Sequence, residues 1–170
     1  MFKTEKTILF NSKNFPKEEA IKTKNISKES KMKILSETKV NEVEKGGYIA
    51  LDPMKKPDAI IISSGEELHA SLRVAKRLKS KGILIRVVSM PNLERFLKQD
   101  KDYIDELLPV EIRKIVIEAS SSFSWNKLIY NSKYLITLDE FGSSGKYKNV
   151  YHKYGFDVES LEEKVENLLK

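Results

Sequence analysis

From residue 59 onward, the chain alternates short apolar runs with longer amphipathic segments. The apolar runs, which lack the strict alternation of half-exposed strands, lie at 59–62, 83–88, 113–118 and 134–138. Such runs are typical of strands covered on both faces. Between the first two, residues 66–80 carry apolar positions at helical spacing: Leu68, Leu72, Ala75 and Leu78. This spacing predicts an amphipathic helix that ends at Lys81-Gly82, with a cation in the last turn and a glycine after it.

Further helices are predicted at 92–98, 101–107, 146–153 and 158–169. Asp157 is the expected N-cap of the last one, and its apolar stripe consists of Val158, Leu161, Val165 and Leu168. Another ordered segment begins at 48–51. Because strands and helices alternate in roughly 25-residue units, right-handed crossovers are expected. The predicted fold is α/β, a three-layer sandwich with a mostly parallel sheet of about five strands and helices on both faces.

The N-terminal part of the chain has a different pattern. Residues 7–10 (TILF) form a short strand-like run, but 17–45 are mostly polar, with scattered apolar residues and no sustained period. This predicts an extended connector or wrapping arm, which closes at Gly46-Gly47. We therefore divide the chain into residues 1–45, an N-terminal arm, and residues 46–170, a folded α/β domain.

Composition restricts the class of protein. The chain has 170 residues, enough for about one domain, and 40% of them are hydrophobic. It has no cysteine, which excludes a disulfide framework, a thiolate metal site and a cysteine nucleophile. No apolar run approaches the roughly 20 residues that cross a bilayer, and the lysine-rich start lacks the apolar core of a signal peptide. We expect a soluble, cytoplasmic protein without a membrane partner.

The formal charge of +6 is concentrated in the arm. Residues 1–56 hold 13 lysines and 8 acidic residues, a net charge of +5, whereas residues 57–170 have a net charge of +1. Arginine, the residue best suited to bidentate base or phosphate contacts, is absent from 1–56. A solvated surface is therefore favoured over a nucleic-acid interface, and no nucleic-acid partner is expected.

Two glycine-containing segments resemble phosphate-binding loops only in part. Ser63-Ser64-Gly65 joins a strand to a helix, where backbone N–H groups can hold an anion, but Glu66 and Glu67 would repel a phosphate there. Residues 142–146 (GSSGK) lack the first glycine and the final Ser or Thr of a P-loop, because Glu140 and Tyr147 stand at those positions. Both segments are interpreted as structural turns.

The histidines and aromatic residues give no catalytic signal. His69 and His152 have no histidine partner at metal-ligand spacing, and both are expected to be exposed to solvent without a local partner. Trp125 and Phe123 are expected to pack a loop against the sheet. From the residues alone, the chain is a binding, assembly or regulatory module. One alternative is a stand-alone domain that binds a small regulatory ligand at the carboxyl edge of its sheet, near residues 63–66, 89–91 and 139–145.

Seven short motifs occur in a fixed order over about two thirds of the chain: 45–49 (KGGYI), 63–67 (SSGEE), 86–91 (RVVSMP), 96–100 (FLKQD), 107–109 (LLP), 139–145 (DEFGSSG) and 154–156 (YGF). This series resembles the C-terminal domain of transketolase, and residues 1–16 resemble the tail of the preceding pyrimidine-binding domain. The domain is similar in topology to those of 1-deoxyxylulose-phosphate synthases and pyruvate dehydrogenase β subunits, but the RVVSMP and KQD elements favour transketolase proper.

The resemblance implies a role in a larger enzyme. Transketolases move a two-carbon ketol unit between sugar phosphates with thiamine diphosphate and a divalent cation (Mg²⁺ or Ca²⁺), in the pentose phosphate pathway. The first two domains of the full enzyme hold these cofactors, so the resemblance implies no catalytic, cofactor-binding or metal-binding residue in this chain. It implies as partners the remaining transketolase domains or a separate subunit, a homodimer in the full enzyme and sugar phosphate substrates. The chain alone is expected to be catalytically inactive.

One substrate-binding element of the family falls within the arm. The family turn S-R-Q-N-L-P supplies an arginine to the sugar phosphate, and the matching stretch here is 11–16 (NSKNFP). Ser12 stands where the arginine is expected, so that function does not carry over. Losing one charge-assisted hydrogen bond weakens binding by about 1.5–3 kcal/mol. We expect Lys13 to supply a point charge in partial replacement, without the bidentate fork of arginine.

Overall fold

The computed structural model describes residues 33–34, 40–139 and 147–170. Ser12 and Lys13, the run at 7–10 and the 140–146 segment lie outside these residues. The described residues all belong to one compact unit.

Six strands of the described part of the chain form a single sheet in the order β1-β2-β4-β3-β5-β6. Their bounds are β1 Lys33–Ile34, β2 Tyr48–Asp52, β3 Ala59–Ser63, β4 Ile85–Ser89, β5 Arg113–Glu118 and β6 Leu135–Thr137. The pairs β3–β4, β3–β5 and β5–β6 are parallel, whereas β2 pairs antiparallel with β4 and β1 antiparallel with β2. The predicted mostly parallel sheet is confirmed, with β2 and β1 added at one edge through two antiparallel pairings.

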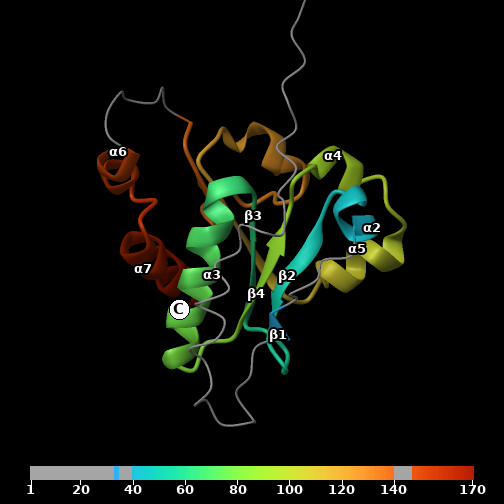
Figure 1. Ribbon diagram of the computed structural model, residues 1–170, viewed down its shortest axis with the longest axis horizontal. Helices are drawn as coiled ribbons and strands as arrows, with labels where there is room; N and C mark the ends of the chain where they lie inside the picture. Colours follow the sequence, from blue (N-terminus) through green and yellow to red (C-terminus); the bar gives the residue numbers. More distant parts are fainter. Residues whose placement is uncertain (1–32, 35–39, 140–146) are drawn as a thin grey trace, which may run out of the picture. The chain divides into compact units, whose positions relative to one another are not determined.

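Helices cover both faces of this sheet (Figure 1). The α-helices are α2 Val40–Glu44, α3 Gly65–Ser80, α4 Leu93–Phe96, α5 Lys101–Leu107, α6 Tyr147–Tyr154 and α7 Val158–Leu169. Two 3₁₀ helices, η3 Ser122–Lys127 and η4 Ser132–Tyr134, lie between β5 and β6. In Figure 1, α3, α6 and α7 lie on one side of the strands, and α2, α4 and α5 on the other. The three-layer α/β prediction is therefore confirmed.

Strand β3 shows why the sheet needs two covering layers. All five of its residues are buried. Ala59 and Ile61 belong to the core under α3 and α7, while Ile60 and Ile62 belong to the core under α4, α5 and η3. Because successive side chains of a strand point to opposite faces, an uninterrupted apolar run is stable only between two layers.

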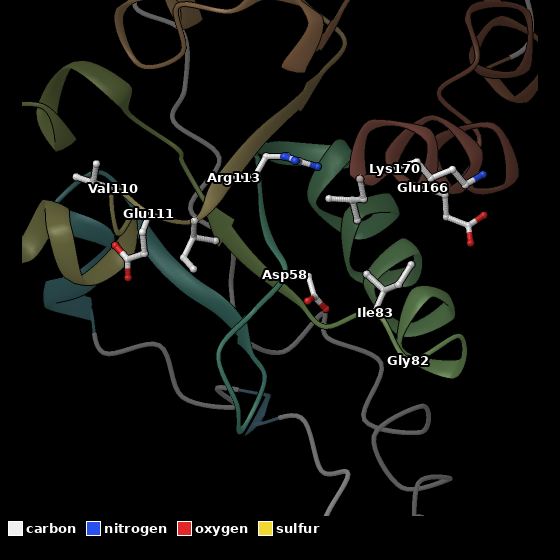
Figure 2. A pocket seen from close by; sticks show the side chains of 10 residues that line it. Asp58, Gly82, Ile83, Val110, Glu111, Arg113, Glu166 and Lys170 are labelled. Carbon is white, nitrogen blue, oxygen red and sulfur yellow. The ribbon is translucent and has the colours of Figure 1, made fainter.

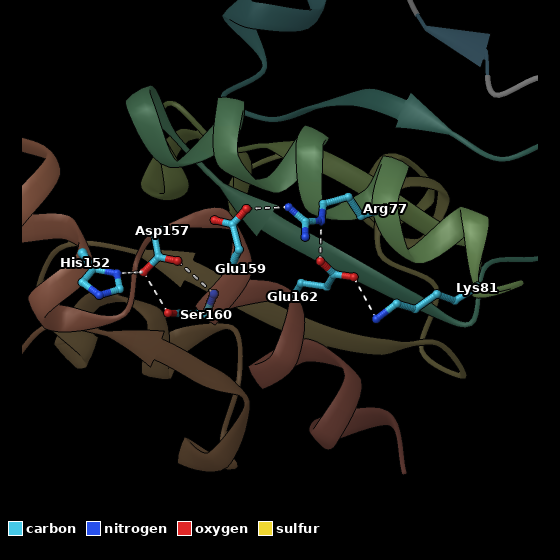
Figure 3. Close-up of polar contacts among 7 residues, drawn as sticks. All are labelled: Arg77, Lys81, His152, Asp157, Glu159, Ser160 and Glu162. Atoms are coloured by element: carbon cyan, nitrogen blue, oxygen red, sulfur yellow. Dashed lines mark hydrogen bonds and ion pairs between the residues drawn. The ribbon is translucent and has the colours of Figure 1, made fainter.

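Helices α3 and α7 are joined by buried apolar residues and by ion pairs along their solvent edge (Figure 3). Leu161 and Val165 of the predicted α7 stripe are fully buried against the α3 core, with Val158 and Leu168 half-buried. The Glu162 carboxylate accepts from Arg77 Nε at 2.5 Å and from Lys81 Nζ at 2.8 Å. Lys81 is thus both the C-cap of α3 and a tether to α7.

The double glycine at 46–47 lies against the loop and helix that follow β4. Gly46 has φ +90°, and a Cβ built on it would lie 2.4 Å from Asn92 O. The Asn92 amide donates to Gly46 O at 3.0 Å, and the buried Tyr103 hydroxyl donates to Gly47 O at 2.7 Å. Only a residue without a side chain allows this close approach of two backbones.

Several sequence predictions differ from the structure in detail. The segment predicted to be an extended connector contains helix α2. Helix α4 covers only Leu93–Phe96 of the predicted 92–98, because Pro91 and the Asn92 N-cap delay its start and Asp100 already caps α5. Trp125 packs into the core as expected, but Phe123 is 79% exposed, so only one of the two aromatic side chains fixes that loop.

Candidate functional site at the carboxyl edge of the sheet

The strand order creates a switch point between β3 and β5. The chain passes from β3 to β4 on one side of β3, and later returns to β5 and β6 on its other side. The connection after β3 enters α3 on one face, and the connection after β5 enters η3 on the opposite face. In open α/β sheets, ligands bind in the crevice at such a point, outside the carboxyl ends of the strands. This edge is therefore the candidate site.

The crevice is occupied by a carboxylate of the chain itself. Glu118, the last residue of β5, accepts hydrogen bonds at Oε2 from the Ser64 amide at 3.0 Å and from the Ser64 hydroxyl at 2.9 Å. Ser64 is the N-cap of α3, and its side chain makes no capping bond to its own helix. The Glu118 carboxyl group therefore occupies the donors at the N-terminal end of α3, and the turn interpretation of 63–65 is supported by this contact.

A second carboxylate lies in the first turn of α3. Glu67 is only 6% exposed, and it accepts a hydrogen bond from the Tyr151 hydroxyl of α6. Burial, together with the charge of Glu67, raises the pKa of Glu118 to about 7, although the two hydrogen bonds from Ser64 oppose the change. Neither carboxylate has an ion-pair partner among the described residues.

The last residues of β3 and β4 are serines at the same carboxyl edge of the sheet. Ser63 pairs with Ser89, and both are buried. The Met90 amide donates to Ser63 O at 2.9 Å, so the two strand ends are held by backbone contacts. The hydroxyls of Ser63 and Ser71 are buried and have no hydrogen-bond partner among the described residues. The carboxyl edge of the sheet therefore contains buried polar groups, and the chain's own side chains cover them.

Asp139 ties the end of β6 to the start of η3. Its Oδ1 accepts from the Ser121 hydroxyl at 2.9 Å and from the Ser122 amide at 2.8 Å, and Oδ2 from the Thr137 hydroxyl at 3.3 Å. These hydrogen bonds, led by the Ser122 amide, hold the pKa of Asp139 below its ordinary value. Of the suggested ligand segment 139–145, only Asp139 lies within the described residues, and it serves the fold.

The two histidines differ from the sequence prediction. His152 is exposed as expected, with 81% of its side chain accessible, but it does have a partner: its Nδ1 lies 3.1 Å from Asp157 Oδ2 (Figure 3). Asp157 caps α7 as predicted, accepting from the Ser160 amide at 3.0 Å. Burial raises the pKa of Asp157, but the hydrogen bonds from Ser160 and His152 outweigh it and lower the net value. His69 is half-buried, not exposed.

A wide hollow of about 750 Å³ lies at the opposite, amino edge of the sheet (Figure 2). Its carboxylates do not converge, since Figure 2 shows Glu111 and Glu166 on opposite sides. Two of its charged groups already serve the fold: Asp58 Oδ2 accepts from the Leu84 amide at 2.7 Å, and Arg113 donates to Leu168 O at 2.6 Å. No group of three metal-ligating side chains occurs in 33–34, 40–139 or 147–170. Nor does any helix in those ranges have the length and apolarity to cross a membrane.

The sequence did not identify Glu118 as a functional group. Its signal was weak: a single acidic residue that ends the buried run RKIVIE. Glu118 and its partner Ser64 are 54 positions apart, and only the parallel pairing of β3 with β5 brings them together. Glu67 was predicted to lie in the first turn of the helix, but its burial and its hydrogen bond from Tyr151 of α6 were not predicted.

Comparison with known proteins adds a family likeness to this geometry. Residues 46–157 match the family described as "Transketolase-like TK C-terminal domain". The chain is 36% identical over 136 residues to the transketolase of Buchnera aphidicola subsp. Baizongia pistaciae and 38% identical over 136 residues to that of Nostoc sp.. Each alignment covers 79% of this chain but 20% of the relative, so the chain spans about a fifth of their length.

Solved structures show the same relation. A transketolase from Pichia stipitis superimposes with a TM-score of 0.69 at 30% identity, over 78% of this chain and 19% of the other. A structure described as a split gene transketolase, inactive beta4 tetramer, has a TM-score of 0.55 at 21% identity, over 74% of this chain and 43% of that one. At that identity, the second likeness is one of fold.

Proposed function

The chain belongs to the transketolase-like C-terminal domain family, and on that premise we propose that it is the C-terminal section of a transketolase, present as a domain or as a separate subunit. In this role it supports the catalytic domains and their dimer. The chain contributes no catalytic group of its own to glycolaldehyde transfer between sugar phosphates. The proposed compartment is the cytoplasm.

One observation carries this proposal: the chain matches the family, and its own Glu118 carboxyl group closes the candidate ligand crevice at the carboxyl edge of the sheet. An enzyme site at the switch point needs an open crevice, but Glu118 already occupies the Ser64 donors. We assign the proposed chemistry, with thiamine diphosphate and a divalent cation, to the first two domains of the full enzyme, as the family resemblance implies.

We propose a domain boundary at residue 46. Residues 1–45 are proposed to be the tail of the pyrimidine-binding domain and its linker, and 46–170 the C-terminal domain. Ser12 and Lys13 are proposed to face the sugar phosphate, with Lys13 supplying the positive charge. In the assembled enzyme, Lys13→Ala should raise the KM for sugar phosphates, and Lys17→Ala, another lysine of the arm, should not. An unchanged KM in Lys13→Ala would exclude this role.

Reconstitution tests the main proposal. The purified chain, supplied with thiamine diphosphate, Mg²⁺ and xylulose 5-phosphate plus an aldose phosphate acceptor, should show no turnover. Addition of the chain that carries the thiamine-binding domains should restore activity at a stoichiometric ratio. The structure of similar fold described as a split gene transketolase, inactive beta4 tetramer, offers a precedent. Turnover by the isolated chain, or a mixture that neither associates nor reacts, would contradict the proposal.

The alternative is a stand-alone domain that binds a small regulatory ligand at the same edge. An anionic ligand at α3 would have to displace the Glu118 carboxylate from Ser64, which disfavours this function. Thermal stabilisation of the isolated chain by sugar phosphates or nucleotides would favour it, because a ligand that binds only the folded state stabilises that state. Salt-dependent binding of DNA or RNA would instead indicate a nucleic-acid module.

A further inference from the structure

The segment between β5 and β6 presents two aromatic side chains to solvent. Phe123 is 79% exposed and Tyr130 is 94% exposed. Single exposed hydrophobic residues are normal on a protein surface, but two nearly fully exposed rings in one short segment are not scattered. Aromatic rings of this kind are enriched in the buried centres of protein interfaces. The segment is therefore a candidate contact surface.

The backbone that carries the two rings is fixed by the rest of the domain. Trp125 and Ile129 of the same segment are buried in the core under α4, α5 and η3, and the Ile129 amide donates to Trp125 O at 3.0 Å. The Ser121 hydroxyl accepts from the Phe123 amide at 3.3 Å and donates to Asp139 at 2.9 Å. A surface that is ordered before binding loses less conformational entropy when a partner docks.

The charges around the rings have one sign. No acidic residue occurs between Glu118 and Asp139, whereas Lys127 and Lys133 are both exposed. Lys127 Nζ lies 3.5 Å from Glu94 of α4, but both side chains are exposed, and such pairs contribute little. Two copies of the chain that met through this surface would bring their lysines together. The charge pattern therefore disfavours a second copy and favours an acidic partner.

Rings flanked by lysines also bind single-stranded nucleic acids, but those sites lie in a positively charged groove. This segment has two cations, and residues 57–170 have a net charge of only +1. A protein partner is therefore favoured. An aromatic side chain contributes about 150–250 Å² when it is buried, and a stable interface covers roughly 800 Å² of each partner. Phe123 and Tyr130 together would supply about half of that area.

We propose that Phe123 and Tyr130 are the anchors by which this domain docks onto an acidic surface of the thiamine-binding domains. This inference rests on the proposed function, because it names the surface through which a C-terminal section supports those domains. The segment lies within the family match, and the chain spans about a fifth of its relatives' length, so most of each relative lies outside the aligned region. The two rings enter apolar pockets of the partner, and Lys127 and Lys133 pair with carboxylates at the rim.

Calorimetric titration of the full chain with the chain that carries the thiamine-binding domains tests this surface. Phe123→Ser and Tyr130→Ser should each raise the Kd about tenfold or more, the usual effect of losing an aromatic anchor. Val110→Ser and Met54→Ser are matched controls, since these side chains are 82% and 70% exposed but precede β5 and β3 at the amino edge. They should leave the Kd unchanged. Lys133→Glu should also raise the Kd, and more at low salt than at high salt.

The outcomes separate this surface from the function on which it rests. If the wild-type chain binds and both aromatic variants bind equally well, the docking surface is wrong and the proposed function stands. A wild-type chain that does not bind contradicts the proposed function and the docking with it. Self-association that Phe123→Ser abolishes, or binding of single-stranded oligonucleotides that Tyr130→Ser abolishes, would assign the rings to a different occupant and overturn the proposal. Since the two variants alter different exposed positions, misfolding of one leaves the other to decide.

Discussion

Arg86 donates two hydrogen bonds to the Asp52 carboxylate, from Nε to Oδ1 at 2.7 Å and from Nη2 to Oδ2 at 3.3 Å, and so joins β4 to its antiparallel neighbour β2. The same guanidinium donates to the carbonyl of Glu106 at 2.8 Å, at the end of α5. One partly buried cation therefore fixes the added edge of the sheet and the helix that covers it. The planar fork of arginine is suited to such a bidentate contact, and lysine is not.

Replacing Arg86 with Lys should destabilise the domain by about 1–3 kcal/mol, because the fork and the carbonyl contact are lost in a partly desolvated site. Urea unfolding followed by Trp125 fluorescence measures this change. Asp105→Asn, which removes the exposed ion pair with Lys101 on α5, should change the stability by less than about 0.5 kcal/mol. Equal effects of the two substitutions would show that Arg86 is an ordinary surface residue.

Gly46→Ala should destabilise the domain by about 2–5 kcal/mol, the sum of left-handed backbone strain and overpacking against Asn92 O. Gly65→Ala is the matched control. Gly65 also has positive φ, at +50°, but a Cβ there meets nothing within 4 Å. Gly65→Ala should therefore destabilise the domain through backbone strain alone, by about 1–2 kcal/mol. Thermal unfolding of the two variants measures the difference, and similar values would mean that the backbone approach at Gly46 relaxes without penalty.

The sequence predicted the parts of the fold that depend on local pattern. The AIII run identified β3 as a strand buried on both faces, and Gly82, with φ +85°, ends α3 where expected. Asp157 was identified as a cap because N-capping needs only a contact three residues along the chain. Helix α2 was missed because five residues, flanked by polar sequence, carry no readable period.

The site was less predictable because its contacts depend on tertiary neighbours. The phosphate-repelling effect of Glu66 and Glu67 was inferred, but the occupant of the helix end is Glu118, which a parallel strand delivers from 54 residues away. The His152–Asp157 contact spans only five residues, yet it requires the turn between α6 and α7. Charged residues near strand ends, such as Asp52 and Arg86, carry no sequence signal of their pairing.

Glu162→Gln should weaken the α3–α7 interface by about 1–3 kcal/mol at pH 7, since it leaves Arg77 and Lys81 without their shared, nearly buried carboxylate. The hydrogen bond from Lys81 and the charges of Arg77 and Lys81 hold the pKa of Glu162 below its ordinary 4.5. Its contribution is therefore present above about pH 5 and lost as pH falls through the lowered value. Glu159→Gln, at a residue whose side chain is 70% exposed, should have a smaller effect.

Chemical unfolding of the Glu162→Gln and Glu159→Gln variants at pH 7 and pH 3 tests this prediction. The stability difference between the wild type and Glu162→Gln should shrink from pH 7 to pH 3, because protonation of the wild-type carboxyl removes the charge that Arg77 and Lys81 bind. A difference that is the same at both pH values would assign the effect to packing and not to charge.

Glu118 should show the opposite pH dependence. Its pKa is raised from 4.5 to about 7 on folding, so the folded state holds the proton more tightly than the unfolded state. The protonated Glu118 carboxyl therefore makes its full contribution to the stability of the folded state below about pH 4.5, and this contribution disappears as pH rises to 7 and beyond. Glu118→Gln, which keeps an acceptor for Ser64, should therefore gain about 1–2 kcal/mol relative to the wild type between pH 4.5 and pH 8.

Urea midpoints at half-unit pH intervals measure that difference directly. Because all other titrating groups are common to both proteins, the difference curve isolates the Glu118 carboxyl. The difference should grow from about pH 4.5 and level off near pH 7. A curve that is flat, or that falls with pH, would mean that Glu118 is ionised in the folded domain at pH 5, and that the carboxylate caps α3 as an ordinary solvated anion.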